Sequence, residues 1–153
     1  MADENKLLDD RKVKEEAIKQ FRLMDDTFMS KVFEDKECAE LLLRVILNKN
    51  DLTVQNTQTQ FEIKNLQGRS ARLDIYAVDS DGVKYDVEVQ RRDSGAVPKR
   101  GRYNSSLLDV NATDPGDDFE NLPRTYVIFI TERDYFRGGQ ELYEITRCVK
   151  NMT

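Results

Sequence analysis

Two acidic residues, Asp74 and Glu88, lie in neighbouring segments whose side chains alternate between apolar and polar. Residues 70–78 and 83–90 have this period of two, which predicts strands, and residues 79–82 between them favour a hairpin turn. The two carboxylates then face each other across the hairpin, where like charges repel unless one is protonated or a cation lies between them. Carboxylate oxygens suit Mg²⁺ or Mn²⁺. The pattern therefore indicates a divalent-metal site, and its plainer alternative is a solvated outer face of the hairpin.

The register of this hairpin follows from the requirement that its apolar side chains share one face. A three-residue loop at residues 80–82, with Gly82 in the left-handed region, satisfies that requirement. The pairs that it predicts are Ala77 with Tyr85, Ile75 with Val87, Leu73 with Val89, and Asp74 with Glu88. A slip by one residue would mix the two faces. Gln90 lies two residues beyond Glu88, so its side chain is expected on the same side of the strand.

The composition restricts the chemistry that such a site can perform. The chain of 153 residues contains no histidine, which excludes Ser-His-Asp and Cys-His nucleophiles, His-ligated zinc and imidazole proton shuttles. Its two cysteines, Cys38 and Cys148, provide neither a zinc site nor a disulfide framework, so we expect a reducing, cytoplasmic location. The sequence also lacks a recognisable signal peptide and any apolar stretch long enough to span a membrane. Hydrolysis by carboxylates and a metal remains available.

The remaining pattern predicts an α/β fold with one core. Helical spacing of apolar residues predicts helices, and alternating or continuous apolar runs predict strands. The helices are expected at residues 10–24, 35–48 and 97–110, and the additional strands at 57–66, 125–131 and 141–147. The continuous apolar run of the 125–131 segment is typical of a central strand buried on both faces. Residues 1–24 are expected to form an N-terminal helical extension, and residues 25–153 the single folded domain.

Several blocks of the sequence, in a fixed order, resemble the PD-(D/E)xK nuclease superfamily. The first signal is the hairpin, with Asp74 on one strand and Glu88-Val89-Gln90 on the next. The other blocks are Phe33 with the helix that follows it, residues 65–69 (NLQGR), 72–75 (RLDI), 87–91 (VEVQR), 99–103 (KRGRY) and 126–130 (YVIFI). Over most of residues 25–147 they are similar to the PD-(D/E)xK nuclease family transposase group, also called recombination-promoting nuclease/putative transposase.

The resemblance implies a restriction-endonuclease-like αβββαβ core, with a mixed sheet flanked by helices. It implies that Mg²⁺ (or Mn²⁺) is held by Asp74, Glu88 and the backbone carbonyl of Val89, and activates water for attack on a phosphodiester. Gln90 stands where the superfamily usually has lysine. A glutamine cannot lower the pKa of water by its charge, but it can orient the water and hydrogen-bond the phosphate.

An acidic residue of the first core helix often completes sites of this kind. Glu37 and Glu40 are the candidates, and Glu37 is slightly better placed. Either residue is equally well explained as an exposed position of an ordinary helix, and the sequence leaves these alternatives open. The catalytic residues that the resemblance implies are therefore Asp74, Glu88, Gln90 and Glu37.

A basic segment follows the hairpin. Residues 91–108 contain five basic residues and one acidic residue, although the whole chain has a net charge of −5. A basic strip directly after a metal site is where a DNA phosphate backbone is expected to lie. Pairing of these side chains with the five acidic residues of segment 109–120 is the alternative. The residues expected to contact DNA are Arg91, Lys99, Arg100, Arg102 and Tyr103.

These observations predict a metal-dependent DNA endonuclease that hydrolyses phosphodiester bonds and is associated with DNA recombination or mobile elements. The alternative is a catalytically inactive nuclease-fold module that binds nucleic acid or a protein partner, which Gln90 and the acidic total favour. The sequence leaves open the roles of Arg69 and Arg72, and it is compatible with a homo-oligomer. Members of the group commonly continue beyond the point where this chain stops, so a shortened C-terminus is also considered.

Overall fold

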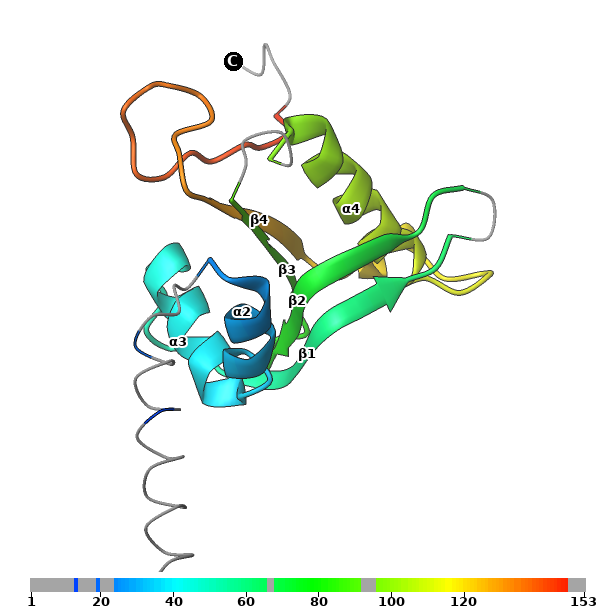
Figure 1. Ribbon diagram of the computed structural model, residues 1–153. Coiled ribbons are helices and arrows are strands. Elements are labelled where there is room, and N and C mark those ends of the chain that lie inside the picture. The colour runs from blue at the N-terminus through cyan, green and yellow to red at the C-terminus, as the bar shows by residue number, and fades with distance from the viewer. Residues whose placement is uncertain (1–12, 14–18, 20–23, 66–67, 92–95, 149–153) are drawn as a thin grey trace, which may run out of the picture.

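The computed structural model describes residues 13, 19, 24–65, 68–91 and 96–148 (Figure 1). Nearly all of the helix predicted at residues 10–24 lies outside the described residues. In chain order the elements are α2 (Asp26–Val32), α3 (Lys36–Leu47), β1 (Val54–Ile63), β2 (Ala71–Asp79), β3 (Lys84–Gln90), α4 (Pro98–Val110), the 3₁₀ turn η2 (Phe119–Asn121) and β4 (Thr125–Thr131). From α3 onward the main helices and strands follow the predicted αβββαβ order.

The four strands form one mixed sheet in the order β1-β2-β3-β4. β2 is antiparallel to both of its neighbours, whereas β3 and β4 are parallel. Parallel strands need a crossover connection, which α4 provides. α2 and α3 pack on one face of the sheet and α4 on the other (Figure 1). The predicted α/β restriction-endonuclease-like fold is therefore confirmed.

The ends of the two long helices are defined by local sequence. The side chain of Asp35 accepts hydrogen bonds from two backbone N–H groups in the first turn of α3. Asn48 ends that helix with a left-handed φ of 51°, which asparagine tolerates better than most residues. Pro98 begins α4, where its missing N–H costs no hydrogen bond. The helices predicted at residues 35–48 and 97–110 are confirmed.

The apolar core consists of two clusters, one on each face of the sheet. The larger cluster lies between the sheet and helices α2 and α3, and includes Met29, Phe33, Leu43, Ile75, Tyr85 and Val87. The smaller cluster lies under α4 and consists of Ile63, Leu73, Leu107 and Leu108. Burial of each large aliphatic side chain contributes about 1.5–3 kcal/mol, so both α3 and α4 are fixed against the sheet. The polar side chains that α4 carries are therefore held in place as well.

Leu73 departs from the face predicted for it. The hairpin pattern placed it beside Ile75, but it packs in the smaller cluster with Ile63. The neighbouring strand has an irregularity at the same level: Gln60 of β1 has a φ of 54° and lies between Thr59, which pairs with Ile75, and Phe61, which pairs with Leu73. Such a conformation is costly for a residue other than glycine and often occurs at functional sites.

Two further predictions about strands are wrong. In the part of the chain that the structure describes, β4 is an edge strand whose side chains are half-buried, not a central strand buried on both faces. Its apolar run is explained by contacts on both sides, because Ile128 and Ile130 pack on the larger cluster and Val127 on the smaller one. Residues 141–147 form no strand. The large aliphatic side chains of this segment are exposed, so it buries no face against the domain.

Candidate active site

The hairpin of β2 and β3 has the predicted register over residues 75–78 and 84–87, but the predicted pair of Leu73 with Val89 is not part of the ladder. Its pairs include Ala77 with Tyr85 and Ile75 with Val87. Gly82 has a φ of 77°, the left-handed conformation expected of it. Asp79 closes the turn, because its carboxylate accepts hydrogen bonds from the N–H groups of Asp81 and Val83 and from the hydroxyl of Tyr85. The turn therefore fixes the register in which β3 pairs with β2.

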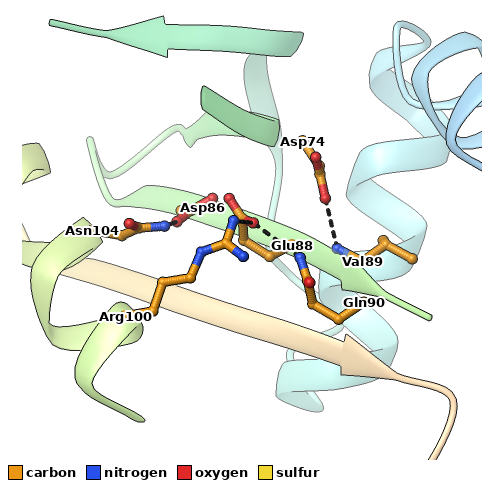
Figure 2. Close-up of polar contacts among 7 residues, drawn as sticks. All are labelled: Asp74, Asp86, Glu88, Val89, Gln90, Arg100 and Asn104. Atoms are coloured by element: carbon orange, nitrogen blue, oxygen red, sulfur yellow. Dashed lines mark hydrogen bonds and ion pairs between the residues drawn. The ribbon is translucent and has the colours of Figure 1, made fainter. Parts of the chain in front are cut away.

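The ladder between the two strands ends one position before Asp74 and Glu88, which do not form the predicted direct pair. Instead, Oδ2 of Asp74 accepts a hydrogen bond of 2.9 Å from the backbone N–H of Val89 (Figure 2). If the ladder continued, this N–H would donate to a backbone carbonyl of β2. The carboxylate of Asp74 takes the place of that carbonyl as the acceptor, and the two strands separate here. Asp74 remains close enough for its charge to act on the carboxyl group of Glu88.

Two side chains of α4 contact two acidic side chains of β3 (Figure 2). Nδ2 of Asn104 donates a hydrogen bond of 2.9 Å to Oδ2 of Asp86, and the guanidinium of Arg100 forms an ion pair with Oε2 of Glu88. Four residues of a helix advance about 6 Å and two residues of a strand about 6.6 Å, so the two pairs match in spacing. Asp86 and Glu88 are both 0% exposed, so the solvated outer face is wrong.

One oxygen of each of these carboxyl groups is buried without a hydrogen-bond partner: Oδ1 of Asp86 and Oε1 of Glu88. The two carboxyl groups lie side by side, close enough to share a proton (Figure 2). Two carboxylates are both acceptors, so neither can satisfy the other until a proton or a cation lies between them. A buried polar atom without a partner costs about 1–3 kcal/mol, and more when it is charged. The two carboxyl groups therefore need either a shared proton or a bound cation.

Burial is the largest cause that raises the pKa of both carboxyl groups, that of Asp86 to about 7 and that of Glu88 to about 8. The charge of Asp74 raises both pKa values further. Arg100 lowers both, and the hydrogen bond from Asn104 lowers the pKa of Asp86. The pair consequently retains a proton near neutral pH, and that proton satisfies the two unpaired oxygens.

Arg100 is positioned by contacts on two sides. Its guanidinium lies over the ring of Phe129, 5.8 Å from the ring centre, and points to Glu88. Gly101 permits this approach, because a Cβ atom there would lie 3.3 Å from the same ring. Nε2 of Gln90 also reaches Oε2 of Glu88, at 3.4 Å. Oε2 of Glu88 therefore accepts hydrogen bonds from one charged side chain, Arg100, and from one neutral side chain, Gln90.

The residues predicted to contact DNA lie in different environments. Lys99 and Arg102 are exposed on α4, as a phosphate contact requires. Arg91 forms an ion pair of 3.2 Å with Asp25. Arg100 is directed at the acidic residues of the sheet instead of outward. The structure therefore separates one inward-pointing basic residue from three that lie at the surface.

Tyr103 connects α4 to the segment between β1 and β2. Its hydroxyl donates a hydrogen bond to the backbone carbonyl of Arg69 and accepts one of 3.3 Å from Nδ2 of Asn65. These hydrogen bonds give the hydroxyl of Tyr103 a structural role. The stacking of a base on its ring stays a prediction. Arg69 and Arg72 are exposed.

The two glutamates of α3 differ in their contacts. Glu40 accepts a hydrogen bond of 2.9 Å from the N–H of Val54 and pairs with Arg44 at 2.7 Å, so it joins α3 to the start of β1. Glu37 is exposed in the first turn of α3, on the face of the sheet opposite to α4. Its catalytic role therefore stays a prediction.

The donor atoms at this point are carboxylate, amide and backbone oxygens, which hard divalent cations prefer. Among the described residues, no group of three or more His, Cys, Asp or Glu side chains is arranged to hold a metal ion. Mg²⁺, however, usually binds through one or two carboxylates and takes its other ligands from water and phosphate. The two unpaired oxygens on neighbouring buried carboxyl groups fit that mode of binding.

The mixed sheet flanked by helices, the separation of β2 from β3 and the acidic residues on these two strands are features that can be compared with known protein families. The model of the PD-(D/E)XK nuclease family transposase matches residues 27–153. The chain belongs to this family. The match includes the whole sheet, α3 and α4, and it indicates a function related to nucleases and transposases. No curated protein and no solved structure gives a significant match. Within the ranges that the structure describes, no helix is long and apolar enough to cross a membrane.

Two residues that contact or neighbour Glu88 and Arg100, Asp86 and Asn104, were not among the candidates named from the sequence. The sequence contains a signal for both. Asp86 precedes Glu88 by two residues, so it lies on the same predicted face of the strand. Asn104 lies four residues from both Arg100 and Leu108, which places all three on one face of a helix. The polar residues Arg100 and Asn104 on the same helix face as Leu108 thus indicate that this face meets polar partners in the core.

Proposed function

We propose that the chain is a metal-dependent DNA endonuclease that hydrolyses phosphodiester bonds. The observation that carries the proposal is the pair of unpaired oxygens on Asp86 and Glu88, buried where β2 and β3 separate. Two neighbouring buried carboxyl groups can bind a divalent cation in place of the proton that they share, and a divalent cation is the usual agent of phosphodiester hydrolysis. DNA is the substrate class that the family suggests.

The residues proposed to hold Mg²⁺ or Mn²⁺ are Asp74, Glu88 and the backbone carbonyl of Val89. When bound, such a cation lowers the pKa of a water molecule and stabilises negative charge on the phosphate. Asp74 is already oriented by the N–H of Val89, so the carboxylate does not have to be ordered on binding. Glu88 is oriented by Arg100 and Gln90. Preorganisation of this kind lowers the entropic cost of binding.

The amide of Gln90 is proposed to orient the attacking water, a role that needs hydrogen bonding and no charge. Arg100 neutralises Glu88 in the absence of metal, and it is 39% exposed, so its guanidinium can also reach a phosphate group. The exposed side chains Lys99 and Arg102 would bind the DNA backbone beside it. Glu37 is retained as a candidate for a further acidic group.

Nicking of supercoiled plasmid tests this proposal. Wild-type protein with millimolar Mg²⁺ or Mn²⁺ is expected to convert supercoiled plasmid to the open circular form, and EDTA is expected to stop the conversion. Asp74→Ala should abolish it while the circular dichroism spectrum stays unchanged. Asp81→Ala is the matched control, because it removes an acidic side chain that is exposed at the tip of the same hairpin. Equal cleavage by Asp74→Ala and the wild type would refute the proposal.

A second candidate function is a catalytically inactive module of the same fold that binds nucleic acid or a protein partner. The observation in its favour is the ion pair between Arg100 and Glu88, which already supplies a positive charge to the acidic residues. Titration with Mn²⁺ distinguishes the two functions. Retained DNA binding with no binding of Mn²⁺ at millimolar concentration would favour the module.

The biological setting is proposed on two grounds. A role in DNA recombination or in mobile elements rests on the family. A cytoplasmic location rests on the two cysteines, which provide no disulfide framework, and a homo-oligomeric state is compatible with the sequence. Complementation of recombination frequency in cells and the molar mass in solution would test them.

A further inference from the structure

The side chain of Asp86 is held in one orientation inside the domain. One of its oxygens accepts the hydrogen bond from Asn104, which is itself only 2% exposed. The other oxygen has no partner and lies beside the unpaired oxygen of Glu88 (Figure 2). Without a metal, the proton that the two carboxyl groups share satisfies these two oxygens; a divalent cation that displaces the proton would find one oriented oxygen on each carboxyl group.

The two acidic residues of the motif are not equivalent in this respect. Oδ2 of Asp74 is already engaged by the N–H of Val89. In contrast, among the described residues the buried side-chain oxygens without a hydrogen-bond partner belong to Asp86 and Glu88, two residues apart on one strand. Among the described side chains, no group of three or more His, Cys, Asp or Glu residues is arranged to hold a metal ion, so a cation would have two carboxyl groups as its first side-chain ligands. The unsatisfied pair is the one on β3.

We propose that Asp86 is a direct ligand of the divalent cation beside Glu88, and that Asn104 is a positioning residue that orients Asp86. This inference rests on the proposed function, since it assigns a further ligand to the same metal site. It also assigns the buried face of α4 a role in metal binding, in addition to the DNA contacts expected of the exposed face.

Isothermal titration of the metal-free protein with Mn²⁺ tests the inference without any measurement of cleavage. Asp86→Asn retains the shape of the side chain and removes one ligand charge, so the affinity for Mn²⁺ should fall at least about tenfold. Asp81→Asn, an exposed substitution with the same change of charge, should leave the affinity unchanged. Asp74→Asn and Glu88→Gln are measured beside them, because they report on the site as a whole.

Thermal unfolding with and without Mn²⁺ separates a ligand from a purely structural residue. For a ligand, Asp86→Asn reduces the rise in Tm that Mn²⁺ produces, whereas a structural residue lowers Tm equally in both conditions. Asp86→Ser, which is smaller and can still contact Asn104, provides a second variant if the first does not fold. For Asn104, replacement by Ala should weaken Mn²⁺ binding, and replacement by Ser, which keeps a donor, should restore part of it.

The outcomes of the Mn²⁺ titrations separate the inference about Asp86 from the proposed function. Loss of Mn²⁺ affinity in Asp86→Asn with unchanged affinity in Asp81→Asn supports the inference. Loss in Asp74→Asn and Glu88→Gln, with wild-type affinity in both Asp86 variants, overturns the inference and leaves the proposed function intact. Absence of Mn²⁺ binding by the wild type overturns both.

Discussion

The buried carboxyl pair predicts that the metal-free protein becomes less stable as the pH rises. Asp86 and Glu88 have pKa values raised by burial to about 7 and about 8, whereas both groups have ordinary pKa values in the unfolded chain. Between roughly pH 4.5 and pH 8 the folded state therefore binds more protons than the unfolded state. Stability contributed by such protonated groups is present at low pH and is lost as the pH rises through the folded-state pKa.

The magnitude follows from the shift at Asp86. A change of about three pH units in its pKa corresponds to at most about 4 kcal/mol, since one unit is about 1.4 kcal/mol. Coupling to Glu88 and local relaxation reduce this ceiling. We expect the free energy of unfolding of the wild type to fall by about 2–3 kcal/mol between pH 5 and pH 8. Asp86→Asn carries no buried charge at this position, so its free energy of unfolding should change less over the same range and exceed that of the wild type at pH 8.

Urea unfolding, followed by circular dichroism in EDTA at pH 5, 6, 7 and 8, measures this dependence. Asp81→Asn is the control and should follow the wild type at every pH, because its side chain is exposed. The reasoning would be refuted by a wild-type free energy of unfolding that is constant or rises from pH 5 to pH 8. An identical pH dependence in Asp86→Asn would also refute it.

Three further predictions concern contacts around this site. Arg100→Met removes the charge that lowers the pKa of Glu88. By urea unfolding, the free energy of unfolding should therefore fall by about 1–3 kcal/mol at pH 8 and by less at pH 5. The control Lys99→Met changes an exposed side chain and should have little effect at either pH. Tyr103→Phe breaks the hydrogen bonds to the segment between β1 and β2 and should cost about 1 kcal/mol; unchanged protease sensitivity of that segment would contradict this role. Asp79→Ala removes three hydrogen bonds that close the hairpin and should cost about 3 kcal/mol, and a change below 1 kcal/mol would show that the turn does not depend on them.

Much of the fold could be predicted because its signals are local. The turn residues up to Gly82 and the alternation of β2 and β3 specify a register that the structure confirms for residues 75–78 and 84–87. The helix caps at Asp35 and Pro98 likewise depend on single residues. β4 was misjudged, because a continuous apolar run has the same appearance in a central strand and in an edge strand that packs against helices on both sides.

The site was less predictable because its geometry depends on contacts between distant elements. Where β2 and β3 separate, Asp74 accepts a hydrogen bond from the backbone N–H of Val89, a residue 15 positions away, and no local pattern indicates this contact. The burial of Asp86 is produced by α4, whose position is fixed by packing of Leu107 and its neighbours. Sequence reasoning therefore identified the acidic strand but treated its polar face as either a metal site or a surface in water.

The central claim is that the acidic residues on the hairpin hold a divalent cation. Anomalous diffraction from crystals soaked in millimolar Mn²⁺ tests it most directly, because the manganese signal locates the ion without any assumption about activity. The account predicts an anomalous peak in contact with Glu88, with the guanidinium of Arg100 displaced from that carboxylate. A map with no peak near Asp74, Asp86 or Glu88, and with the ion pair to Arg100 intact, would contradict it.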